Sequence, residues 1–161
     1  MAIYFLFGKK DEIKGNVTSK GFENWVEADT FQVGAARSVP MMVGKASQRE
    51  ASNPSLSEVS FSKILDPSSP YLFQESLVGE GKPLEVHVTK TGADNIETLV
   101  KYTFDSAMIS GYSISSSGDV PVESVSFAYT KVEMQLVEWD KDHKKSSPHT
   151  VGYDLGTGKK V

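Results

Sequence analysis

The chain contains no cysteine among its 161 residues. Without thiols it has no disulfide framework, no cysteine-ligated zinc or iron–sulfur cluster, and no thiol nucleophile. Its apolar runs fall short of the roughly 20 residues that a membrane-spanning helix requires. A cleaved signal peptide is not indicated either, because the charged side chains follow the short apolar run at residues 1–7 instead of preceding it. We therefore expect a protein that begins in the cytoplasm and, if exported, leaves without a cleaved signal.

The chain also lacks an excess of positive charge. It has 17 lysine and arginine residues and 21 aspartate and glutamate residues, which gives a net charge of -4. We expect neither nucleic-acid binding nor membrane insertion, because both nucleic acids and anionic membranes attract basic surfaces. With 39% hydrophobic and 24% charged residues the chain can bury a core. Its length predicts one domain over residues 1–161.

Alternating apolar and polar side chains dominate the sequence and predict β-strands. Turn-forming stretches rich in glycine, serine and aspartate separate these runs. Many short strands at this spacing indicate an antiparallel sandwich or barrel. Strands are predicted over residues 3–7, 22–33, 55–65, 84–88, 96–104, 107–115 and 150–155.

The longest predicted strand covers residues 122–139. Its apolar side chains lie first on odd positions and then on even ones: Val125, Phe127 and Tyr129, followed by Val132, Met134 and Leu136. A slip of one residue moves every following side chain to the other face of a strand. The sequence therefore predicts either a β-bulge near residues 130–131 or a strand that changes its buried face.

One helix is predicted. Ser68 or Ser69 can cap its start, Pro70 suits its first turn, and Gly79 ends it. A helix of this length is unstable alone and must dock on the sheet. Its expected packing stripe consists of Leu72, Phe73 and Leu77.

Residues 34–54 form a long loop without a clear period, which is uncommon in a compact domain unless the loop has a function. Within it lies an apolar run of Val39, Pro40, Met41, Met42 and Val43. If this run is exposed, it forms a patch that needs a partner. The alternative is that the loop folds back on its own barrel, and the sequence leaves both possibilities open.

The chain offers few groups for catalysis. His87 is interpreted as a polar surface residue, and His143 and His149 as parts of a solvated loop tip in preference to a weak metal site. No Gly-x-Ser-x-Gly elbow occurs, and residues 156–160 resemble only a fragment of a phosphate loop, so we expect a frayed tail there. We predict no catalytic residue, no cofactor and no metal, and we favour a binding, structural or assembly role over an enzyme.

Two further hypotheses stay open at this point. The first is a hydrolase that uses His87 or His149. The second is a ligand-binding sandwich with Trp25 or Trp139 as an exposed platform, although tryptophan in a barrel more often lies in a core or an interface.

Two stretches carry a family resemblance: VSFSKILDPSSPYL at residues 59–72 and ISGYSISSSGDVPVESVSFAYTKVE at residues 109–133. Together they resemble the Hcp family, the haemolysin-coregulated proteins that form the inner tube of the bacterial type VI secretion system. Residues 13–15 (IKG) and 87–92 (HVTKTG) are similar to weaker motifs of that family, in the same order. The resemblance extends over nearly the whole chain.

The resemblance implies a mainly β fold, a small β-barrel of two antiparallel sheets with one flanking short α-helix, as in phage tail-tube proteins. It implies hexameric rings that stack into a hollow conduit inside contractile sheath proteins, with a spike protein at the tip and effector cargo in the lumen. It also implies secretion without a cleaved signal peptide. The alternative is a tail-tube protein of a phage or phage-derived contractile device.

In that family the loop at the position of residues 34–54 reaches toward neighbouring subunits or the next ring. The resemblance therefore assigns Val39, Pro40, Met41, Met42 and Val43 to a subunit or ring interface. Many relatives have a Gly/Ser-rich loop instead, so this apolar run is a departure from the family pattern.

Overall fold

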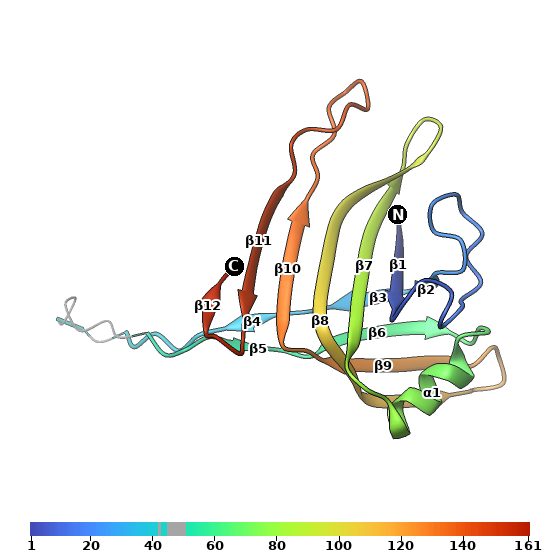
Figure 1. Ribbon diagram of the computed structural model, residues 1–161, viewed down its shortest axis with the longest axis horizontal. Coiled ribbons are helices and arrows are strands. Elements are labelled where there is room, and N and C mark those ends of the chain that lie inside the picture. Colours follow the sequence, from blue (N-terminus) through green and yellow to red (C-terminus); the bar gives the residue numbers. More distant parts are fainter. Residues whose placement is uncertain (42, 45–50) are drawn as a thin grey trace.

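The computed structural model describes residues 1–41, 43–44 and 51–161 of the chain (Figure 1). One helix, α1 (Ser69–Val78), lies between β6 (Val59–Ile64) and β7 (Lys82–Thr91). No helix in these ranges is long and apolar enough to cross a membrane. The strands are β1 (Ala2–Phe7), β2 (Val26–Ala28), β3 (Thr30–Gln32), β4 (Ala35–Ala36), β5 (Ser55–Leu56), β6 (Val59–Ile64), β7 (Lys82–Thr91), β8 (Ile96–Ser115), β9 (Val122–Ala128), β10 (Lys131–Leu136), β11 (His149–Asp154) and β12 (Lys159–Lys160).

Ten of the strands form two antiparallel sheets that share β8, and β4 and β5 form a separate two-stranded ribbon. Sheet A has the order β12-β11-β10-β8-β7-β1-β2, and its long strands stand upright in Figure 1. Sheet B has the order β3-β6-β9-β8 and lies across the lower part of the same view. The predicted mainly β fold with two antiparallel sheets and one helix is confirmed.

Strand β8 replaces two predicted strands. Residues 96–104 and 107–115 were expected as separate elements, whereas β8 continues through Asp105 and Ser106. Its first half pairs with β7 and β10 in sheet A, and its second half pairs with β9 in sheet B. Ser106 has a φ of 49°, in the left-handed region, at the point where β8 passes between the sheets. The prediction of two separate strands is therefore wrong, and the exposed polar pair marks a bend within one strand.

The predicted strand over residues 122–139 is in fact two strands in different sheets. β9 belongs to sheet B and β10 to sheet A, and the chain crosses at Tyr129 and Thr130. The core-facing apolar residues lie on odd positions in β9 and on even positions in β10, because the chain passes from one sheet to the other and both sheets face the same core. Tyr129 packs in that core against Phe104, with ring centroids 4.8 Å apart. The observed crossing therefore accounts for the parity change without a bulge.

The core between the sheets is rich in phenylalanine. Phe5 stacks on Phe61 at a centroid distance of 4.5 Å, and Phe7 meets Phe127 edge-on at 5.0 Å. Aromatic pairs in such geometries add to the free energy gained from burying their area. Because these rings come from β1, β6 and β9, they hold sheet A against sheet B.

A second, smaller cluster covers the other face of sheet A. It contains Tyr4, Val17, Phe22 and Trp25, with the last three supplied by the segment between β1 and β2. Gly15 allows the segment to approach, because a Cβ there would lie 2.2 Å from the Trp25 carbonyl oxygen.

The helix begins and ends where the sequence predicts. Ser68 is its N-terminal flanking residue, Pro70 lies in its first turn, and Gly79 follows its last turn. The predicted packing stripe is wrong, since only Leu72 is fully buried while Phe73 is 52% and Leu77 is 69% exposed. The helix packs mainly against one strand, β8, so a single row of side chains reaches the core.

The predicted frayed tail is also wrong. Lys159 and Lys160 form β12, which pairs with Asp154 and Tyr153 of β11. The glycine-rich stretch before it is the turn of a short hairpin, in which Gly158 has a φ of 66°.

Candidate assembly surfaces

Part of the predicted long loop is a β-ribbon that leaves the body of the molecule. β4 pairs with β5, and the Ser57 N–H donates to the Gly34 carbonyl at 2.8 Å. Further out, the Ser38 N–H donates to Ser52 Oγ at 3.0 Å. Figure 1 shows this ribbon projecting to the left of both sheets. Residues 42 and 45–50 lie outside the described residues.

The apolar run on this ribbon is exposed where the structure describes it. Met41 is 87% exposed, and Val39, Pro40 and Val43 are exposed as well. Met42, the fifth member of the predicted interface, lies outside the described residues. The described members do not pack on the molecule's own core. Because they are exposed together, they form an apolar patch of the kind that a partner covers.

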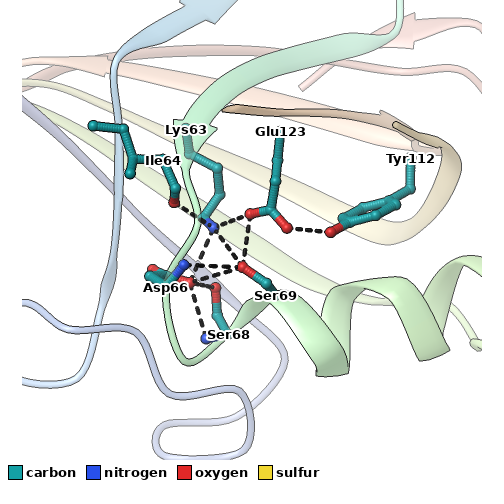
Figure 2. A network of polar contacts seen from close by, with 7 residues as sticks. All are labelled: Lys63, Ile64, Asp66, Ser68, Ser69, Tyr112 and Glu123. Carbon is teal, nitrogen blue, oxygen red and sulfur yellow. Dashed lines mark hydrogen bonds and ion pairs between the residues drawn. The ribbon is translucent and has the colours of Figure 1, made fainter. Parts of the chain in front are cut away.

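A buried polar network fixes the start of α1 (Figure 2). Lys63 of β6 and Glu123 of β9 are opposite each other in the register of sheet B, and both side chains are fully buried. The Lys63 ammonium donates to Glu123 Oε2 and to Asp66 Oδ1, the latter at 2.9 Å. Ser69 of α1 donates to Glu123 Oε2 at 2.7 Å.

The charges in this network are balanced only when all of its side chains are present. One ammonium lies between two carboxylates, and the excess negative charge is stabilised by donated hydrogen bonds from Ser69 and Tyr112. Burial, together with the hydrogen bond to Glu123, raises the pKa of the Tyr112 hydroxyl above its ordinary value. The phenol therefore stays protonated and keeps donating.

From its place directly before Pro67 and the start of α1, Asp66 is expected to be a capping and turn residue. Asp66 does accept from the Ser68 N–H at 2.9 Å, as that interpretation requires, but it also pairs with Lys63. Lys63 and Glu123 both lie in the resemblance motifs, yet nothing suggested that they meet. The signal available was a charged residue at a core-facing position of each strand, between apolar neighbours.

Sheet B has an outer face of small hydroxyl side chains. Ser60 lies beside Ser126, and Ser62 beside Ser124, in the register of β6 and β9. Thr30 Oγ1 hydrogen-bonds Ser62 Oγ at 2.8 Å. This face is polar but carries no charge on these rows, in contrast to the acidic chain as a whole.

Both sheets leave strand edges and apolar surface open within the described residues. At the edges of sheet B, β3 pairs only with β6, and the second half of β8 pairs only with β9. On the core-facing side of sheet A, Leu136 of β10 and Val151 of β11 are 38% and 50% exposed. Open edges and uncovered apolar faces are the surfaces that neighbouring chains cover.

The other face of sheet A carries paired charges. Glu85 of β7 accepts from His87 Nε2 at 2.6 Å and from the Lys101 ammonium at 2.8 Å. The hydrogen bond from His87, followed by that from Lys101, lowers the pKa of Glu85 to about 2. This carboxylate is therefore charged at any physiological pH and is positioned as a structural group.

The three histidines lie in different surroundings and do not form a common site among the described residues. His87 is not the surface residue that was predicted, because its ring packs edge-on against Trp25 and Phe22, each at a centroid distance of 5.2 Å. His143 contacts Glu97 at 2.8 Å, and His149 is exposed on β11. Among the described residues, no group of three or more histidine, aspartate or glutamate side chains could hold a metal ion.

The tryptophans do not form an exposed platform. Trp25 is buried in the smaller cluster, and Trp139 is half-buried with its indole N–H donating to the Thr98 carbonyl at 2.9 Å. The ligand-binding sandwich hypothesis loses the exposed surface on which it depended.

Comparison with solved structures identifies the fold. A structure described as that of a type six secretion system protein has a TM-score of 0.88 at 24% identity, covering 99% of each chain. Hcp1 from Salmonella typhimurium has a TM-score of 0.74 at 23% identity, covering 100% of each chain. A 6-fold symmetrised structure of the anti-feeding prophage baseplate has a TM-score of 0.51 at 11% identity, covering 83% of this chain and 90% of that one. These similarities establish a shared fold.

Comparison by sequence identifies the family. No curated protein matches the chain. A family model described as type VI secretion system effector, Hcp, matches residues 7–136, which include both motif stretches and the Lys63 and Glu123 positions. The chain therefore belongs to the Hcp family of type VI secretion system proteins.

Proposed function

We propose that this protein is the structural subunit of a type VI secretion inner tube, in which hexameric rings stack into a hollow conduit. The observation that carries the proposal is the family match over residues 7–136. The open edges of sheet B support it, since they give each copy two surfaces for joining copies on either side. A repeated contact between two different surfaces closes into a ring when its rotation allows.

Ring closure in this proposal joins the β3 edge of one copy to the β8 edge of the next. The resulting continuous sheet would satisfy backbone groups that are otherwise exposed on both edges. The uncovered apolar side chains Leu136 and Val151 supply a second contact, because burying them against a neighbour removes apolar area from water.

The hydroxyl face of sheet B then lines the conduit. A wall of serine and threonine side chains hydrogen-bonds water and carries no charge on the rows formed by Ser60, Ser62, Ser124 and Ser126. Such a wall has no strong field that would hold one cargo and exclude another. This suits a channel that carries effector proteins of different charge.

The apolar run at Val39, Pro40, Met41, Met42 and Val43 serves in this proposal as a contact between subunits or rings. The further partners are the contractile sheath proteins around the tube and a spike protein at its tip. The protein is cytoplasmic before the device fires and is then secreted without a cleaved signal peptide.

The alternative function is a tail-tube subunit of a phage or phage-derived contractile device. The similarity to the anti-feeding prophage baseplate favours keeping it. Genes for a type VI sheath, baseplate and membrane complex next to this one would exclude it, whereas genes for tail fibres and a capsid would support it.

Export tests the proposed function. We expect the protein in the medium of a culture with a working sheath and not in that of a matched strain whose sheath cannot contract. A cytoplasmic marker protein, absent from both media, controls for lysis. Equal release from the two strains would contradict the proposal.

A further inference from the structure

An apolar groove of about 430 Å³ opens beside α1. Its walls include Leu65, Phe73 and Ile114, which are all about half exposed, and the Tyr112 ring. Its floor includes Ser69, which the buried network of Lys63 and Glu123 holds in place (Figure 2). The groove is therefore a concave surface with a fixed polar floor and apolar walls, of a size that can receive a few side chains.

The groove continues into an acidic hollow. A second depression of about 140 Å³ shares Leu65 and Asp66 with the groove and is also lined by Glu27 and Asp29. The Asp66 carboxylate is engaged by Lys63. Glu27 and Asp29 are exposed, and neither forms an ion pair with another described residue. A ligand that fits both depressions needs apolar side chains next to a positive charge.

The projecting ribbon presents that combination. We define the ribbon tip as Arg37, Val39, Met41 and Val43, all of them exposed. Residues 34–54 contain three basic residues and one acidic residue, in a chain with a net charge of -4. The tip and the two depressions are thus complementary in both charge and polarity.

The tip does not face the groove of its own copy. The ribbon leaves sheet B next to Val59, at the start of β6, whereas the groove lies next to Leu65, just after its end. Five residue steps of extended strand separate these ends by about 17 Å. The ribbon also projects away from α1 in Figure 1.

We propose that the ribbon tip of one copy binds in the groove beside α1 of a second copy, with Arg37 directed to Glu27 and Asp29. This inference rests on the proposed function, and it names the acceptor surface for the apolar run. The contact joins two different surfaces, so it can repeat from copy to copy. In the proposed function the β3 and β8 edges of sheet B already close the ring, which leaves the ribbon contact for joining one ring to the next.

Engineered cysteines test the contact directly, because the parent chain has none. We expect Met41→Cys combined with Phe73→Cys or Leu65→Cys to give a ladder of covalent multimers when assembled protein is treated with a mild oxidant. Met41→Cys with Leu77→Cys is the matched control, since Leu77 is exposed on α1 but does not line the groove. The control should give at least about ten-fold less multimer, because disulfide formation needs Cβ atoms within about 4.5 Å.

Charge-reversal variants provide a second test of the contact. Arg37→Glu is expected to raise the protein concentration needed for stacking about two- to five-fold, as is typical of one exposed ion pair. Asp29→Arg in the same chain should restore assembly, because the pair is then reversed instead of lost.

The outcomes separate this inference from the proposed function. If tubes form but the groove pairs do not link beyond the control, the inference is overturned and the tube function stands. If charge reversal weakens stacking and Asp29→Arg does not restore it, Arg37 does not act through this hollow and the inference is likewise overturned. If the parent chain forms neither rings nor tubes at any concentration, the proposed function fails, and this inference fails with it.

Discussion

Lys63 and Glu123 show at the scale of single residues how this fold uses charge. Both side chains are fully buried, and their free energy depends on the match between one ammonium, two carboxylates and the surrounding donors. A buried ion pair contributes little net stability by itself, but removing one partner leaves an uncompensated charge in the core. The network therefore contributes mainly by specifying where α1 begins.

We predict that Lys63→Met lowers the free energy of unfolding by about 3–5 kcal/mol, because Glu123 and Asp66 then remain buried without a cation. Urea denaturation followed by circular dichroism measures the loss. The double variant Lys63→Met with Glu123→Gln should be less destabilised than the sum of the two single variants. Additive losses would show that the two side chains do not interact.

Glu85 gives a pH prediction at the same scale. Its pKa is about 2 in the folded state and close to 4.5 in the unfolded state, so its stabilisation is complete above pH 4.5 and is lost as the pH falls toward 2. The Glu85→Gln variant, which does not titrate, should be less stable than the parent by about 2 kcal/mol at pH 6. The difference should disappear near pH 2 in urea titrations. A difference that is constant with pH would contradict the assigned partners.

At the scale of elements, the helix shows which features a local sequence pattern can predict and which it cannot. The sequence predicted its bounds, because Pro70 and Gly79 act on the backbone locally. The sequence did not predict its packing face, because that depends on α1 lying against only one strand of sheet B. Likewise, alternation predicted that residues 96–115 are β, but only the partners in both sheets show that β8 is one strand.

We predict that Leu72→Ala lowers the free energy of unfolding by about 2–5 kcal/mol, as for other fully buried leucines. The same substitution at Leu77, on the same helix but 69% exposed, should change it by less than about 0.5 kcal/mol. Both values come from urea denaturation at one pH. Similar losses at the two positions would support the stripe that the sequence suggested.

The projecting ribbon gives a second prediction for an element. Met41→Asp with Met42→Asp should leave the far-ultraviolet circular dichroism spectrum and the unfolding midpoint unchanged, since an exposed loop contributes little to the core. The variant should stack less at a given concentration, as measured by sedimentation. A lost folded signal would show that the loop packs on its own barrel.

At the scale of the whole molecule, the sequence predicted the fold better than it predicted the surfaces. The sequence predicted the two sheets, the helix and the family, because each follows from local pattern or motif order. It could not predict the hydroxyl face of sheet B, the paired Lys63 and Glu123, or the groove beside α1. Those features exist only once strands distant in sequence are set in register, as β6 and β9 are.

The molecule distributes its polarity in a way that suits a repeating subunit. Charged pairs such as Glu85 and Lys101 lie on one sheet, uncharged hydroxyls lie on the other, and apolar side chains are exposed at open edges and on the ribbon. An isolated protein gains nothing from the open edges, which favour aggregation. A ring covers them.

Native mass spectrometry of the purified full-length chain, with negative-stain electron microscopy of the same sample, tests the central claim most directly. We predict a species of six copies that images as a ring with a central hole, and stacks of such rings at higher concentration. A protein that stays monomeric at every concentration tested, with no ring in the images, would contradict the account.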